Sequence, residues 1–189
     1  MRRSESGRQV LEEMPRVSSD TWPQEKLLEL PKDTFGFQYA SWMSKHGFVS
    51  DERPVSTYVQ DVELAYIIQR YRETHDTMHT LLGYDVTVGD EIAVKWYEMA
   101  EIGLPSTALA SFMGPLHLVG SGLKNGDLGE LKTLMAQQLP HIMHCVDLKR
   151  DNSEFFMSIF WEKEFETPCD ELRERMGIVS FEQFQQLQR

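Results

Sequence analysis

Two histidines and two acidic residues form the pattern in this sequence that could do chemistry. His75 and His79 are four positions apart, Asp76 follows the first of them, and Glu91 comes twelve positions after the second. Residues four apart lie on one face of an α-helix, so the two imidazoles would project together. Imidazole and carboxylate groups bind Zn²⁺, iron and manganese, and the residue types alone do not distinguish these metals. The spacing therefore predicts a metal site. The alternative is a pair of core histidines that hydrogen-bond to nearby carboxylates.

The histidines need a helix to hold them, and the apolar pattern predicts one over about residues 61–82. Apolar or amphipathic residues recur at spacings of three and four, at Leu64, Ile67, Ile68, Tyr71, Met78 and Leu82. His75 and His79 fall within this stripe and should face the core. Gly83 is expected to end the helix, and Thr87 to cap a second helix over about residues 88–102. An antiparallel pair of helices would return Glu91 to the histidines.

Arg72 and Lys95 are the two candidates for a catalytic role beside the metal ligands. Arg72 projects close to the side of His79 and could pair with a substrate carboxylate. Lys95 lies four residues after Glu91 and could hold that carboxylate or attract an anionic substrate. Each has an ordinary alternative, which is a structural ion pair with a helix neighbour. The sequence assigns no other catalytic residue.

The stretch around the histidines resembles the signature of a known family. The run Arg70–Gly83, together with Glu91 in an H-D-x-x-H-x(11)-E spacing, closely resembles the ubiquinone (coenzyme Q) biosynthesis protein four family. Further stretches are similar to the same family, namely Asp61–Gln69, Val94–Glu98, Gly103–Pro105 and Gly114–Leu116. The resemblance extends from about Gly7 to Ile178. It implies that His75, Asp76, His79 and Glu91 are metal ligands.

The family resemblance also implies a fold and an activity. The expected fold is all-α, a single-domain helical bundle with an apolar tunnel or groove, over about residues 21–189 after a flexible segment at 1–20. The expected activity is carbon–carbon lyase chemistry in ubiquinone biosynthesis. It is a metal-dependent C1-decarboxylation, simple or oxidative with hydroxylation, of a polyprenylated 4-hydroxy-3-methoxybenzoate head group. The implied cofactor is Zn²⁺, although iron or another divalent metal also suits the ligands.

The alternative function is a non-catalytic, lipid-binding organiser of the multi-enzyme ubiquinone-synthesis complex. In either case the implied partners are a polyprenylated benzoate or quinone lipid, other ubiquinone-biosynthesis enzymes and, peripherally, a membrane. The family's eukaryotic members are mitochondrial, so if this protein is eukaryotic, the resemblance implies a peripheral location on the matrix side of the mitochondrial inner membrane. Residues 1–20 mix arginines with glutamates and do not resemble an acid-poor transit peptide. A bacterial origin would explain this composition equally well.

The charge balance argues against two kinds of partner, namely nucleic acids and anionic lipid bound through a polybasic patch. The chain has 189 residues and a net charge of −11, from 30 acidic and 19 basic side chains. Nucleic-acid binding needs a basic surface, and so does anchoring to anionic lipid by a polybasic patch. The two cysteines, Cys145 and Cys169, make no disulfide framework and favour a reducing compartment.

Residues 104–123 contain no Asp, Glu, Lys or Arg. Their glycines, prolines and hydroxyl side chains make them only moderately apolar, so a membrane span is not predicted. We expect either a buried helix broken near Gly114-Pro115 or the wall of an apolar tunnel. Because the family's substrates lie in a bilayer, peripheral membrane contact through apolar side chains is also expected.

Several remaining stretches are interpreted as structural. A second group of possible metal ligands consists of His141, His144 and Cys145. These residues follow Pro140, lack a carboxylate at matching spacing and do not match the family motif, so they are not predicted to bind a metal. The aromatic run at residues 155–161 fits a strand or a helix, and the family's helical nature favours helix. The aromatic residues at 35, 37, 39, 42 and 48 are interpreted as packing. Polar connections are expected near Arg53-Pro54 and over residues 149–153.

Overall fold

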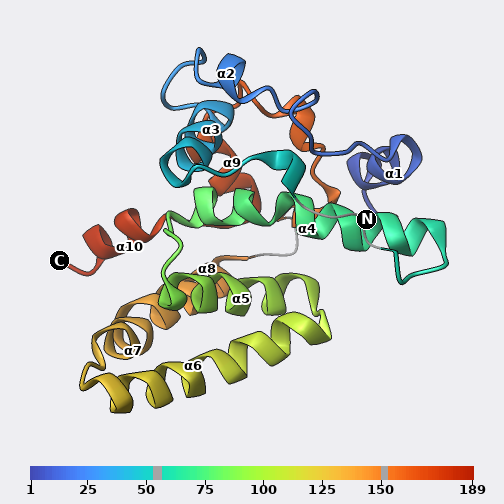
Figure 1. Ribbon diagram of the computed structural model, residues 1–189. Helices are drawn as coiled ribbons and strands as arrows, with labels where there is room; N and C mark the ends of the chain where they lie inside the picture. The colour runs from blue at the N-terminus through green and yellow to red at the C-terminus, as the bar shows by residue number, and fades with distance from the viewer. Residues whose placement is uncertain (53–56, 150–152) are drawn as a thin grey trace. The chain divides into compact units, whose positions relative to one another are not determined.

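The structure is a computed structural model that describes residues 1–52, 57–149 and 153–189, and α-helix dominates these ranges (Figure 1). The α-helices are α1 (Glu5–Glu13), α2 (Gln24–Leu27), α3 (Phe35–His46), α4 (Val62–Leu82), α5 (Val88–Ile102), α6 (Pro105–Asn125), α7 (Gly129–Thr133), α8 (Leu139–Leu148), α9 (Cys169–Met176) and α10 (Phe181–Leu187). No β-strand occurs in the described ranges, where Thr34 and Pro168 form an isolated bridge. The prediction of an all-α fold is confirmed. The connections expected at 53–54 and 150–152 lie outside the described residues.

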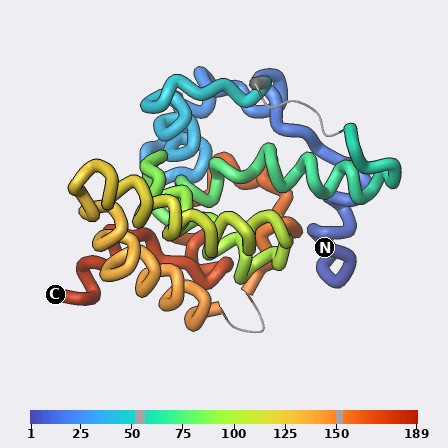
Figure 2. Tube along the Cα trace, turned by 60° about the horizontal axis from the view of Figure 1, so that its bottom comes forward, coloured from blue at the N-terminus to red at the C-terminus, as the bar shows by residue number. Residues whose placement is uncertain are grey.

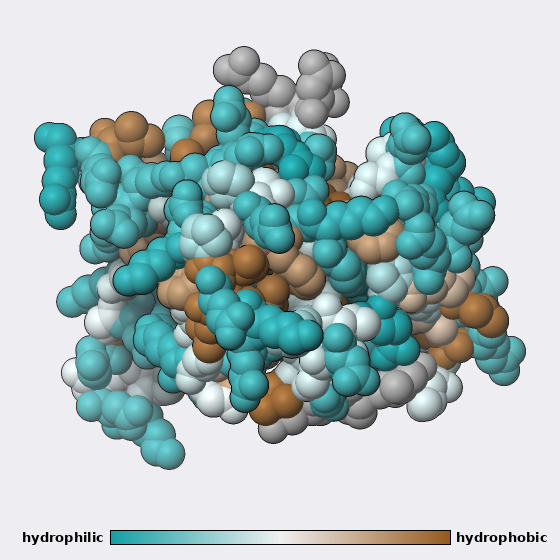
Figure 3. Space-filling model, turned by 90° about the horizontal axis from the view of Figure 1, so that it is seen from above, coloured by the Kyte–Doolittle hydropathy of each residue, from teal (hydrophilic) through white to brown (hydrophobic). Residues whose placement is uncertain are grey.

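The short 3-10 and π-helical turns complete the chain. They are η1 (Ser50–Glu52), η2 (Leu134–Gln138, a π-helix), η3 (Phe156–Ser158) and η4 (Trp161–Lys163). The aromatic run at 155–161 therefore forms short 3-10 turns, which confirms helical over strand geometry but not a regular α-helix. The face drawn in Figure 3 is largely hydrophilic, in keeping with a chain in which 26% of residues are charged.

The two helices that were predicted to carry the metal ligands are present at the expected bounds. Gly83 follows α4 with φ +76°, a left-handed conformation that glycine adopts without steric cost. The Thr87 hydroxyl accepts a hydrogen bond from the Asp90 backbone N–H at 3.1 Å and caps α5. Local signals in the sequence therefore set the end of the first helix and the start of the second.

The chain folds as two compact units. Unit 1 comprises Met1–Thr80 and Glu154–Leu172, and unit 2 comprises Leu81–Ser153 and Arg173–Arg189. The segment 1–20, expected to be flexible, includes helix α1 in unit 1. Val10 of α1 is fully buried in a cluster with Tyr66 and Phe160. The proposed boundary at residue 20 remains a prediction.

Unit 1 combines an aromatic core with buried ion pairs on α4. Trp22 packs edge-on against Tyr39, with ring centroids 4.8 Å apart, and close to the fully buried Phe35. On α4, Arg70 forms a bidentate ion pair with Glu162, through Nη1–Oε1 at 2.5 Å and Nη2–Oε2 at 2.9 Å. Only 1% of the Arg70 side chain is exposed.

A second ion pair holds α4 one turn further along. The buried Glu73 carboxylate accepts hydrogen bonds from the Arg16 guanidinium at 2.6 and 2.8 Å and from the Val17 backbone N–H at 3.0 Å. At 100° per residue, Arg70 and Glu73 both lie on the side of α4 away from His75. These pairs therefore fix the helix by the face that does not carry the histidines.

In unit 2, α5 packs against both α6 and α8 (Figure 2). One side of α6 carries mostly small residues at spacings of three and four. Thr107, Ser111, Leu118 and Gly122 are buried there, and Gly114 is half-buried among them. A Cβ atom built on Gly114 would lie 2.5 Å from Ile92 Cγ1 of α5. Glycine at this position permits the close approach of the two helices.

The prediction for residues 104–123 was wrong on two points. Helix α6 continues through Pro115 without a break, and it is not buried. Five large apolar side chains are 54–72% exposed, namely Leu109, Phe112, Met113, Leu116 and Leu123. The physical reason is that only the small-residue face packs on α5, which leaves the large residues on the opposite side. Within the described ranges, no helix has the length and apolar character needed to cross a bilayer. The tunnel remains a prediction.

Replacing Gly114 with alanine is expected to destabilise the protein by about 1–3 kcal/mol, because the added methyl group would overpack the contact with Ile92. Gly120 on the same helix is the matched control, since its Cβ would meet no atom within 4 Å. Gly120→Ala should stabilise α6 by about 0.5–1 kcal/mol. Urea unfolding measures both variants. Equal free energies of unfolding for the two would contradict the close packing of α5 and α6.

Candidate metal centre

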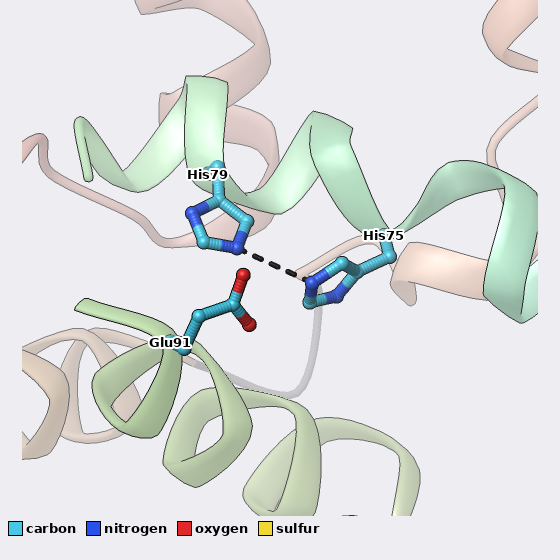
Figure 4. Close-up of side chains that lie close together, drawn as sticks. All are labelled: His75, His79 and Glu91. Atoms are coloured by element: carbon cyan, nitrogen blue, oxygen red, sulfur yellow. Dashed lines mark hydrogen bonds between the residues drawn. The ribbon is translucent and has the colours of Figure 1, made fainter. Parts of the chain in front are cut away.

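The two histidines of α4 lie together and are withdrawn from solvent. His75 is 8% exposed and His79 is fully buried. Their Nε2 atoms are 3.2 Å apart, and the two rings are nearly perpendicular, at 83°. Figure 4 shows both Nε2 atoms directed toward a common point. The i, i+4 spacing therefore produces a pair of nitrogen ligands, as predicted.

Glu91 supplies a third group. One ligand atom each from His75, His79 and Glu91 lies within 4.8 Å of the others, and the Glu91 carboxylate points toward the imidazoles (Figure 4). Glu91 is half-buried in the first turn of α5, the turn capped by Thr87. The structure therefore contains a cluster that could hold a metal ion.

The donor set fits a divalent metal. Zn–N bonds are about 2.0–2.1 Å long, so two nitrogens bound to a tetrahedral zinc are about 3.3 Å apart. The observed Nε2–Nε2 distance of 3.2 Å is close to that value. Two imidazoles and one carboxylate leave a coordination position for water or substrate, as in catalytic zinc sites. The same set occurs in non-haem iron sites, so the ligands do not identify the metal.

The other predicted site residues lie on the same two helices. Asp76 is 5% exposed and is not one of the three residues of the cluster. It remains a predicted ligand or a group that supports His79, three residues further along α4. Arg72 is half-buried, two turns before His79. The Lys95 ammonium forms an ion pair at 2.7 Å with the fully buried Glu98 carboxylate. The catalytic roles of Arg72 and Lys95 remain predictions.

The second histidine cluster has a structural arrangement. The His141 Nε2–H donates to the Val179 carbonyl at 2.8 Å, so Nδ1 accepts from the Tyr84 hydroxyl at 2.7 Å. Burial lowers the pKa of His141 to about 4 and raises the pKa of the Cys145 thiol to about 11. A neutral imidazole with both nitrogens in hydrogen bonds fits the interpretation of this cluster as structural.

Trp42 lies near the histidines, a position that the sequence did not predict. The Trp42 ring lies 5.2 Å from the His79 ring, with an angle of 36° between their planes. The sequence interpretation grouped Trp42 with the packing aromatics. No local pattern links positions 42 and 79, because the contact joins two helices that are far apart in the sequence.

Comparison with known proteins places these features in a family. A model described as "Coenzyme Q (ubiquinone) biosynthesis protein Coq4" matches residues 1–182. A mitochondrial Coq4 homologue of Paramecium tetraurelia is 41% identical over 173 residues, which are 92% of this chain and 77% of the relative. The mitochondrial homologue of Homo sapiens is 34% identical over 180 residues, which are 95% of this chain but only 63% of that relative.

A solved structure supports the fold. A crystal structure of a candidate ubiquinone biosynthesis protein from Nostoc punctiforme matches with a TM-score of 0.70 over 95% of this chain and 78% of that chain, at 20% identity. At this identity the likeness supports the helical fold alone. The family model and the Paramecium relative go further, because each covers most of the sequence. The chain therefore belongs to the coenzyme Q (ubiquinone) biosynthesis protein Coq4 family.

Proposed function

We propose that this protein acts in ubiquinone biosynthesis as a carbon–carbon lyase that removes the C1 carboxylate of a polyprenylated 4-hydroxy-3-methoxybenzoate. The observation that carries the proposal is the cluster of His75, His79 and Glu91, in which three ligand groups approach within 4.8 Å. An organiser of other enzymes would not need such a cluster with an open ligand position. The names of the relatives support a mitochondrial location, and we place the protein peripherally on the matrix side of the inner membrane as part of this proposal.

His75, His79 and Glu91 would hold the metal, with Asp76 as the group that orients His79 or as a fourth ligand of a metal with more than four coordination positions. When bound, a divalent metal polarises the oxygen substituents of a substrate as a Lewis acid. Arg72 would pair with the C1 carboxylate and orient it. The bond between C1 and the carboxyl carbon then breaks, carbon dioxide leaves, and a proton is added to C1. Lys95 would attract the anionic head group. In the oxidative form, dioxygen and one water molecule would be consumed as a hydroxyl group replaces the carboxylate at C1, and carbon dioxide and hydrogen peroxide would be released. This redox chemistry would suit iron better than redox-inert zinc.

The variant Asp76→Asn separates the lyase from the organiser. It keeps the size of the side chain but removes its charge, and loss of such a supporting group costs metal sites about 10–100-fold in activity. The purified protein would be incubated with a polyprenylated 4-hydroxy-3-methoxybenzoate, and carbon dioxide and the ring product would be followed. Binding of other ubiquinone-biosynthesis enzymes would be measured in parallel. We expect turnover to fall while the partners remain bound.

The matched control is Asp61→Asn. Asp61 is exposed, and its carboxylate accepts a hydrogen bond from the Leu64 backbone N–H at the start of the same helix. Turnover of this control should stay near that of the unmodified protein. A metal-loaded protein that assembles with its partners but releases no carbon dioxide would support the organiser instead.

The exposed apolar side of α6 is proposed to contact the bilayer that holds the substrate. Leu109, Leu116 and Leu123 follow one another at seven-residue intervals and are 62–72% exposed. No charged residue interrupts positions 104–123. A second copy of the chain is a poorer occupant, because two copies of net charge −11 repel each other. A zwitterionic lipid surface offers apolar contact without that repulsion.

Replacing Leu116 with glutamate should weaken binding to phosphatidylcholine vesicles by about 10-fold or more, because burying a leucine contributes about 1.5–3 kcal/mol. Vesicle flotation measures the bound fraction. The control is Asn125→Glu, which adds the same charge on the opposite side of α6 and should leave binding unchanged. A protein that floats equally well with Leu116→Glu, or a dimer that this variant dissociates, would contradict the membrane contact.

A further inference from the structure

We propose that Trp42 is a positioning residue of the metal centre, where its indole ring fixes the plane of the His79 imidazole. This inference rests on the proposed metal site. The two ring centroids are 5.2 Å apart, within the range at which aromatic rings attract each other, and the ring planes are tilted by 36°. Because His79 is fully buried and its Nε2 lies 3.2 Å from His75 Nε2, a rotation of the ring would move one nitrogen ligand away from the other.

The sequence around α3 explains why Trp42 is held in place. The Thr34 hydroxyl caps the start of α3, and Phe35, Tyr39 and Met43 bury one side of this helix in the core of unit 1. Trp42 lies seven residues after Phe35, at the edge of the same side of α3, and is half-buried one turn before His46. The rings of Trp42 and His46 are 4.7 Å apart. The core contacts of α3 therefore hold the Trp42 indole in place whether or not a metal is bound.

The end of α3 adds a third ring to this group. Gly47 has φ +68°, which permits a tight turn in which the Phe48 backbone N–H donates to the Met43 carbonyl at 3.0 Å. The turn brings the Phe48 ring to 5.7 Å from Trp42 and 5.6 Å from His46. His46 and Phe48 thus flank Trp42 and restrict its rotation. The Trp42 indole therefore presents a fixed surface to the His79 imidazole.

The chemistry of an indole suits a metal-bound imidazole. An imidazole that donates its lone pair to a divalent cation becomes more positive, and an indole face attracts positive charge within about 6 Å of its centroid. The contact at 5.2 Å lies inside that range. Ligating histidines are commonly oriented by a neighbouring group, and loss of that neighbour typically weakens metal affinity about 10–100-fold. Trp42 would stabilise the bound state and orient the ligand at once.

The test uses the full chain and Co²⁺ alone, whose visible absorption reports the ligand geometry. Affinity is measured by competition with a coloured chelator for the unmodified protein, Trp42→Leu and Trp42→Phe. Trp96→Leu is the matched control, because Trp96 is half-buried on α5 and its ring contacts Phe112 instead. Circular dichroism establishes that each variant is folded. If Trp42→Leu does not fold, Trp42→Met takes its place.

We expect Trp42→Leu to bind Co²⁺ about 10-fold more weakly and to shift its absorption bands. Trp42→Phe, which keeps an aromatic ring, should recover most of the affinity, and Trp96→Leu should match the unmodified protein. Equal affinity and spectra for Trp42→Leu and Trp96→Leu would overturn the role of Trp42 and leave the metal site intact. If the unmodified protein binds no Co²⁺, the metal site itself is wrong, and the role of Trp42 is wrong with it.

Discussion

Replacing His79 with alanine should weaken Zn²⁺ binding by more than about 100-fold and lower the rate of decarboxylation by a similar factor. The loss of a supporting group costs about 10–100-fold, and loss of a direct ligand costs more. His79 is fully buried, and its Nε2 lies 3.2 Å from His75 Nε2. No exposed side chain can therefore take the place of this nitrogen. Metal content after dialysis against a chelator and the release of carbon dioxide are measured on the same preparations.

The control for this prediction is His117→Ala, which removes an exposed histidine of α6 and should leave metal content and turnover unchanged. Because alanine leaves a cavity, His79→Gln is tested beside it as a variant of nearer volume. If folded His79 variants retain the metal of the unmodified protein, the cluster of His75, His79 and Glu91 is not the metal site. If only the folded state is lost, the histidine is structural.

Replacing Arg70 with leucine is expected to lower the free energy of unfolding by about 3–5 kcal/mol, the largest effect on stability that the structure implies. Breaking a buried ion pair is costly because one charge is left without its partner. Arg70 is 1% exposed, and its Nη atoms hold both oxygens of Glu162. Glu162 would keep the hydrogen bond from the Trp22 indole N–H, at 3.2 Å, but would lose its cation.

Arg2 provides the comparison for Arg70. Its ion pair with Glu63 spans a similar distance, 2.6 Å, but the Arg2 side chain is 76% exposed. Exposed pairs contribute little, so Arg2→Ala should change stability by less than about 1 kcal/mol. Urea denaturation monitored by tryptophan fluorescence measures both variants. A loss below about 1 kcal/mol for Arg70→Leu would show that the pair is not buried as described.

The parts of the structure that were predicted from the sequence depend on local signals. Helices α4 and α5 were predicted at nearly their observed bounds because apolar spacing, Gly83 and Thr87 lie within the segments they define. The histidine pair was predicted for the same reason, since i, i+4 spacing becomes contact in any α-helix. The approach of Glu91 to the histidines was predicted because only a short connection separates the two consecutive helices.

The parts that were not predicted depend on contacts between distant residues. The contact of Trp42 with His79 and the pair of Arg70 with Glu162 join segments 37 and 92 residues apart. The prediction for helix α6 was wrong for a different reason. Its lack of charge was interpreted as burial, whereas the packed side of the helix is set by small residues such as Gly114. Composition alone does not reveal which side of a helix has a neighbour.

The ion pairs on the far side of α4 have a consequence for how a metal would enter. Arg16, Arg70, Glu73 and Glu162 hold this helix without help from the histidines, within unit 1. His75 and His79 are therefore preorganised, and their ordering entropy is lost when the chain folds and not when the ion arrives. Capture of a metal at this chelating pair then needs little reorganisation, and the metal-free protein should present the same pair of nitrogens to each ion that it meets.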